Sequence, residues 1–119
     1  MERLLKAWQN SWRAFGRLAR TEKAFQQELV LLAVSLPAAW LLSTSWRGYS
    51  LLVGAILLIM LVEVLNTAIE AACDAVSADF NVEIQLAKDC GSLAVLISVL
   101  IAVVVWGLAV FETVTGLPA

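Results

Sequence analysis

The sequence predicts an all-α integral membrane protein, with an N-terminal amphipathic surface helix followed by three transmembrane helices. Of its 119 residues, 61% are hydrophobic, and the mean hydropathy of +0.87 is far above that of ordinary globular domains. Six of the eight basic residues precede the first apolar run. This basic segment is interleaved with leucine and tryptophan and leads into an apolar span, so its expected partner is a lipid bilayer and not nucleic acid.

Residues 1–20 form the predicted surface helix. Their apolar side chains recur at steps of three and four residues, which is the spacing of one helix face: Leu4, Leu5, Trp8, Trp12, Phe15 and Leu18. A solvated charged tail is the alternative, but two tryptophans four residues apart favour the membrane surface. Thr21 is the predicted N-cap of the next helix, with Glu22 in its first turn.

Three membrane spans are expected, at about residues 29–46, 50–76 and 90–111, in a single domain that covers residues 1–119. Pro37 should kink the first span. Residues 45–48 should form a turn, and residues 77–89 a polar connection. The basic N-terminus is expected inside the cell, and an aromatic belt is expected on the outer side: Trp40, Trp46, Tyr49, Trp106 and Phe111.

A polar stripe interrupts the second apolar run. Glu63, Asn66, Glu70 and Asp74 fall within roughly 80° of one helix face. Measured from Leu51, Glu63 lies about 18 Å, Glu70 about 28 Å and Asp74 about 34 Å along the helix axis. A carboxylate at a helix centre in the bilayer costs about 2.5–3.5 kcal/mol, so a functional role is expected for Glu63. The alternatives are interhelical hydrogen bonds, by a protonated Glu63 or by Asn66.

The stripe and the nearby Lys88 suit phosphoryl transfer to a lipid alcohol. Two carboxylates can hold Mg²⁺, a lysine can neutralise phosphate, and a third carboxylate can accept the proton of an attacking hydroxyl. The same spacing also suits a proton or cation pathway. No Walker motif or GxGxxG motif is present, and a zinc site has no credible ligands because the chain lacks histidine. Cys73 and Cys90 are expected to be small buried residues.

Four segments carry a resemblance to a known family. EVLNTAIEAACD at 63–74, AKDCGSLAVL at 87–96, SW at 11–12 and EKAFQQE at 22–28 resemble the small prokaryotic integral-membrane diacylglycerol kinases, a family that includes undecaprenol kinases. The resemblance implies an ATP- and Mg²⁺-dependent transferase of the bacterial inner membrane that converts diacylglycerol to phosphatidic acid. It also implies a homotrimer whose active sites are shared between subunits at the cytoplasmic interface.

The resemblance further implies a role for individual residues. Glu63 would be the general base, and Glu22 and Glu70 would bind the metal that bridges the ATP phosphates. The remaining ATP-binding residues would be Arg3, Asn10, Asn66, Asp79, Asn81, Lys88 and Asp89, and the lipid side would be lined by Gln27, Glu28 and Ser92 together with Glu63. Asp74 is expected to support the neighbouring loop.

The chain departs from the family pattern at residues 79–81, which read DFN where glutamate, tyrosine and histidine are expected. Gly91 and Ser92 resemble the diacylglycerol branch more than the undecaprenol branch. Undecaprenol kinase is the nearest alternative function. From another class, a non-catalytic oligomeric membrane protein or an ion pathway stays open.

Overall fold

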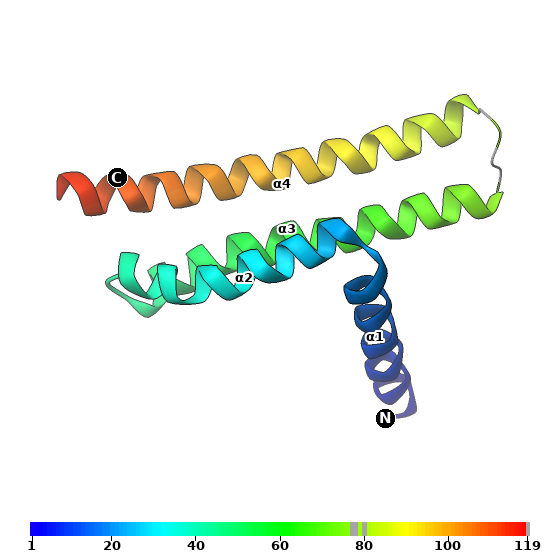
Figure 1. The fold of residues 1–119 in the computed structure, drawn as a ribbon, viewed down its shortest axis with the longest axis horizontal. Coiled ribbons are helices and arrows are strands. Elements are labelled where there is room, and N and C mark those ends of the chain that lie inside the picture. Colours follow the sequence, from blue (N-terminus) through cyan, green and yellow to red (C-terminus); the bar gives the residue numbers. More distant parts are fainter. Residues whose placement is uncertain (77–78, 80, 119) are drawn as a thin grey trace.

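The computed structural model describes residues 1–76, 79 and 81–118, and its regular structure is entirely helical. The helices are α1 (Glu2–Thr21), α2 (Lys23–Leu42), α3 (Trp46–Val76) and α4 (Val82–Thr115). Figure 1 shows α2, α3 and α4 aligned along the molecule, with α1 projecting away from them. Helices α2, α3 and α4 are each long and apolar enough to cross a membrane. The prediction of an all-α protein with three such helices is therefore confirmed.

Helix α3 is the centre of the bundle, because it packs along both α2 and α4, which barely touch each other. Its buried residues Ala55, Ile56 and Ile59 form a core with Ala102 of α4. Several other buried positions hold small side chains, such as Ser35, Ala39 and Ser98. Small residues let helix backbones approach closely, which is how helices pack in membranes.

Most large apolar side chains lie on the outside of this bundle. Leu41 is 82% exposed and Val103 is 61% exposed, and similar residues occur along all three long helices. A soluble monomer rarely carries an apolar surface of this extent. The surface is suited to contact with lipid or with other membrane helices.

The junction between α1 and α2 differs from the prediction. Thr21 is the last residue of α1, not the N-cap of α2, and its Oγ1 donates to the Arg17 carbonyl oxygen at 2.7 Å. Threonine makes this backward hydrogen bond readily within a helix, which competes with N-capping. Glu22 stands alone between the two helices with an extended backbone.

The other connections are also shorter than predicted. The turn between α2 and α3 occupies residues 43–45, because Ser45 accepts the Gly48 N–H at 3.0 Å and α3 begins at Trp46. Helix α4 begins at Val82, so most of the expected polar connection at residues 77–89 is helical. Pro37 lies inside α2, which continues to Leu42.

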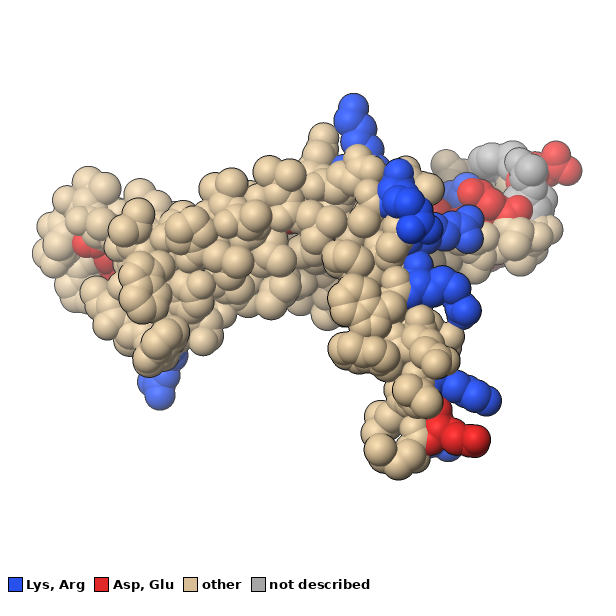
Figure 2. Space-filling view, turned by 60° about the horizontal axis from the view of Figure 1, so that its bottom comes forward, with Lys and Arg blue, Asp and Glu red and all other residues tan. Residues whose placement is uncertain are grey.

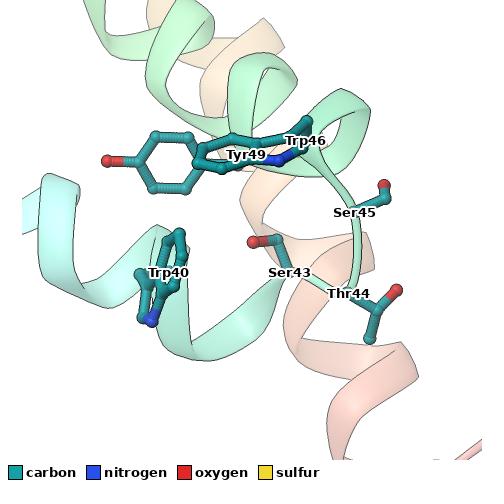
Figure 3. Close-up of a pocket in the computed structure, with 6 residues that line it drawn as sticks. All are labelled: Trp40, Ser43, Thr44, Ser45, Trp46 and Tyr49. Carbon is teal, nitrogen blue, oxygen red and sulfur yellow. The ribbon is translucent and has the colours of Figure 1, made fainter.

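Two ends of the bundle can be distinguished. We call the end that carries Glu63–Asp74 the acidic end, and the end that carries Trp40, Trp46 and Tyr49 the aromatic end. At the aromatic end these three rings pack edge to face, with centroids 5.6–6.0 Å apart. Together with residues 43–45 they line a cavity of about 360 Å³, shown in Figure 3. This cavity lies at the opposite end of α3 from the acidic residues.

Candidate active site

Four carboxylates gather at the acidic end. Glu63 and Glu70 come from α3, Glu28 comes from α2, and Glu22 comes from the junction that precedes α2. The charge of Glu63 interacts with those of Glu22, Glu28 and Glu70. Glu22, Glu28 and Glu63 are half-buried, whereas Glu70 is exposed. Glu63 is thus within electrostatic range of Glu22 and Glu70, the two predicted metal ligands, and of Glu28, one residue of the predicted lipid side.

Asn66 lies in the contact between α3 and α4 and is only 8% exposed. Its Nδ2 donates to Glu70 Oε1 at 3.2 Å. Its Oδ1 is buried and, like Glu28 Oε1, has no hydrogen-bond partner among the described residues. Buried polar atoms without conventional partners are rare in folded proteins, so these two oxygens mark Asn66 and Glu28 as unusual buried polar positions.

Lys88 and Asp74 form an ion pair across α3 and α4. Lys88 Nζ lies 2.8 Å from Asp74 Oδ1, and the two side chains are 42% and 66% exposed. The ion pair links the two helices that flank the loop, which is compatible with the expectation that Asp74 supports this loop. Because both side chains reach solvent, the ammonium group can meet a phosphate without leaving Asp74.

Asn81 has a local structural role. Its Oδ1 accepts the N–H groups of Glu83 at 2.8 Å and Ile84 at 3.3 Å, so it is the N-cap of α4. Asp79 is exposed, and Phe80 lies outside the described residues. Asp89 and Ser92 are exposed on α4, and Gln27 is exposed on α2.

Helix α1 does not bring its predicted ATP-binding residues to the acids of the same chain. Figure 1 shows α1 leading from its junction with α2 to an N-terminus far from α3 and α4. Arg3 and Asn10 are exposed on this helix, and Asn10 Oδ1 accepts a hydrogen bond from Arg13 Nη2 at 2.8 Å. In Figure 2 most of the Lys and Arg side chains in view gather along one side of α1 and around its junction with the bundle.

The donor set at the acidic end fits Mg²⁺ when phosphate is present. Within residues 1–76, 79 and 81–118, no group of three Asp, Glu, His or Cys side chains is placed to hold a metal ion. Magnesium is commonly bound by only one or two carboxylates, with phosphate oxygens and water completing its octahedron. Glu22 and Glu70 supply carboxylates of this kind, and the charges of both act on Glu63.

Two features were not anticipated from the sequence. Cys90 is exposed and Cys73 is only half-buried, so the prediction of two buried thiols is wrong. Their apolar character suits the outer face of a membrane helix as well as its core. Gly91 is buried directly against Asn66. The family resemblance had drawn attention to Gly91, but nothing in the sequence predicted this contact.

Together, the fold and this oxygen-rich end define a small all-helical protein with three helices long and apolar enough to span a membrane and a group of acidic side chains at one end. The family model for prokaryotic diacylglycerol kinase matches residues 9–110. A diacylglycerol kinase of Escherichia coli (strain K12) is 36% identical over 104 residues, which cover 87% of this chain and 85% of that protein. A diacylglycerol kinase of Pseudomonas aeruginosa is 37% identical over 106 residues, with coverage of 89% and 86%. The chain belongs to the prokaryotic diacylglycerol kinase family.

Proposed function

We propose that this protein is an ATP-dependent lipid kinase that phosphorylates diacylglycerol to phosphatidic acid. The observation that carries the proposal is the half-buried Glu63 carboxylate, which lies on an apolar helix within reach of the charges of Glu22 and Glu70. Family membership and the names of the relatives support the same reaction.

In the proposed reaction the free hydroxyl of diacylglycerol attacks the γ-phosphorus of ATP. A new oxygen–phosphorus bond forms as the bond to the ADP oxygen breaks, and the hydroxyl proton passes to the Glu63 carboxylate. Glu63 suits this role because a diglyceride hydroxyl sits just below the lipid headgroups, and Glu63 is the acid of the stripe placed deepest in the apolar part of α3.

The phosphate side of the site is proposed to consist of oxygen ligands and a lysine. Glu22 and Glu70 would hold Mg²⁺, which supplies charge neutralisation of the ATP phosphates when bound. Asn66, Lys88 and Asp89 would position ATP, with Arg3, Asn10, Asp79 and Asn81 near it. The lipid would be contacted by Gln27, Glu28 and Ser92.

A homotrimer with shared sites is part of this proposal. The projection of α1 leaves Arg3 and Asn10 away from the acids of their own chain, so these residues would serve a site completed by another subunit. The exposed apolar faces of α2 and α4 offer the surface that such an assembly needs.

We further propose that α1 lies on the cytoplasmic membrane surface, with its Lys and Arg side chains toward the headgroups. The N-terminus would be inside the cell. The spans at about 29–46, 50–76 and 90–111 would cross the inner membrane.

Transfer of labelled phosphate from ATP by the purified protein tests the proposal. Diacylglycerol and undecaprenol are supplied in parallel mixed micelles, with Mg²⁺ or with excess EDTA. We expect Mg²⁺-dependent labelling of diacylglycerol and loss of labelling with EDTA. Preferential labelling of undecaprenol would reassign the acceptor, and labelling of neither lipid would contradict the kinase function.

A further inference from the structure

Helices α3 and α4 meet at Gly91 with no room for a side chain. A Cβ atom built on Gly91 would overlap Asn66 Oδ1, and it would lie 3.1 Å from Asn66 Cγ and 3.7 Å from Ile69 Cδ1. Real Cβ atoms do not approach other atoms as closely as this Oδ1 would require. The amide of Asn66 therefore occupies the space that any side chain at position 91 would need.

The Asn66 amide is held between Gly91 on one side and Glu70 on the other. Asn66 is only 8% exposed and Gly91 is buried, so the amide has little free space around it. Its Oδ1 faces Gly91, and its Nδ2 donates to Glu70 Oε1 at 3.2 Å. A Cα–H group can act as a weak donor to oxygen where helices touch, and glycine offers a hydrogen where other residues carry Cβ. The glycine thus gives a partial partner to an oxygen that lacks a conventional one.

We propose that Gly91 is a positioning residue of the active site. Because Gly91 has no side chain, the Asn66 amide can pack against it. In this position the amide holds Glu70 through its hydrogen bond, in an orientation suited to metal binding. Gly91 itself touches neither substrate nor metal, and it acts through Asn66. The inference rests on the proposed function for the role of Glu70, whereas the contact between Gly91 and Asn66 is a feature of the fold.

Two other glycines of the same helix pair provide matched controls. A Cβ added to Gly107 of α4 or to Gly54 of α3 would meet nothing within 4 Å among the described residues. Replacement of any of these glycines by alanine gives the same gain in helix propensity. A difference between Gly91→Ala and Gly107→Ala therefore reports the contact with Asn66 and not the general effect of alanine in a helix.

The test compares the full-length variants in mixed micelles. The half-saturating Mg²⁺ concentration is measured for phosphate transfer to diacylglycerol and for binding of ATP. In Gly91→Ala the added methyl group displaces the Asn66 amide, so the hydrogen bond from Asn66 Nδ2 to the Glu70 carboxylate is lost. This loss should raise the half-saturating Mg²⁺ concentration about tenfold. Gly107→Ala should stay within about twofold of the wild type, because its added methyl meets no neighbour. A merely structural role for Gly91 would reduce the yield of folded protein without shifting the Mg²⁺ dependence of the folded fraction.

A double-mutant cycle tests whether Gly91→Ala changes the Mg²⁺ dependence through its contact with Asn66. Asn66→Ala removes the obstructing oxygen, so adding Gly91→Ala to it should change the Mg²⁺ dependence of ATP binding by less than about twofold. The inference is overturned if Gly91→Ala behaves like Gly107→Ala, or if it has the same effect with and without the Asn66 amide. If Gly91→Ala alone does not fold, recovery of folded protein in the double variant supports the contact, and failure to recover overturns it.

The inference and the proposed function can fail separately. A wild-type protein that binds ATP with Mg²⁺ but transfers no phosphate contradicts the kinase function alone. The Mg²⁺ dependence of ATP binding then still decides whether Gly91 positions the site. Absence of Mg²⁺-dependent ATP binding by the wild type would overturn both.

Discussion

Trp106→Phe should loosen the contact between α3 and α4 at the aromatic end without affecting catalysis. The indole Nε1 donates to the Leu52 main-chain oxygen at 3.0 Å across the two helices. That oxygen lies inside a helix, where it also accepts the N–H four residues ahead, so loss of the indole does not leave it without a partner. The lost hydrogen bond contributes about 1 kcal/mol. The smaller ring gives up about 1 kcal/mol more of apolar contact, so the free energy of unfolding should fall by about 2 kcal/mol.

Reversible unfolding in mixed micelles, followed as the fraction of SDS is raised, measures this change. Leu41→Ala is the control, because Leu41 of α2 is 82% exposed, and it should change the free energy of unfolding by about 0.5 kcal/mol or less. Leu52 precedes Glu63 by about 17 Å along α3, so the turnover number of Trp106→Phe should stay within about twofold of the wild type. Equal stability of the two variants, or a tenfold loss of turnover in Trp106→Phe, would refute the reasoning.

Two further predictions separate structural from substrate contacts at the acidic end. Asn81→Ala should lower the free energy of unfolding by about 1 kcal/mol through loss of the α4 N-cap. Asn81→Ser should restore the free energy of unfolding, because serine can also cap the helix. If both variants have a higher KM for ATP than the wild type, Asn81 contacts ATP directly. Asp74→Asn should raise the KM for ATP about threefold, because Lys88 loses the partner that orients it, with little change in stability since the pair is exposed. A tenfold loss of turnover at saturating ATP would instead place Asp74 in the chemistry.

Helix number and type were predictable because the apolar runs are long and separate. The bounds were less predictable, since they depend on single polar side chains. Thr21 has the sequence context of an N-cap, yet its hydroxyl bonds back to Arg17 and ends α1. Residues 82–89 include three charged side chains and a glutamine, so hydropathy places them outside a span, although Asn81 followed by Glu83 was a helix-start signal.

The acidic stripe was predictable from helical periodicity, because Glu63, Asn66 and Glu70 lie within one helix. The different contacts of the individual stripe residues were not predictable, because these contacts depend on which side chains α2 and α4 place beside α3. The pairing of Asp74 with Lys88 and the seating of Asn66 against Gly91 are tertiary contacts between α3 and α4. Glu22 and Glu28 join the cluster only because α2 packs along α3. The roles carried over from the family resemblance stay predictions.

Phosphate transfer by Glu63→Gln tests the central claim most directly. The measurement is the initial rate of phosphatidic acid formation at saturating ATP, Mg²⁺ and diacylglycerol. Glu112→Gln is the matched control, because Glu112 lies on α4 toward its C-terminal end, far along the helix from Gly91 and Ser92. Loss of the proposed general base should lower the rate by at least about a hundredfold while the variant keeps the wild-type oligomeric state in detergent, and Glu112→Gln should retain the wild-type rate. Wild-type rates in an intact Glu63→Gln variant would contradict the assignment of Glu63 as the catalytic base.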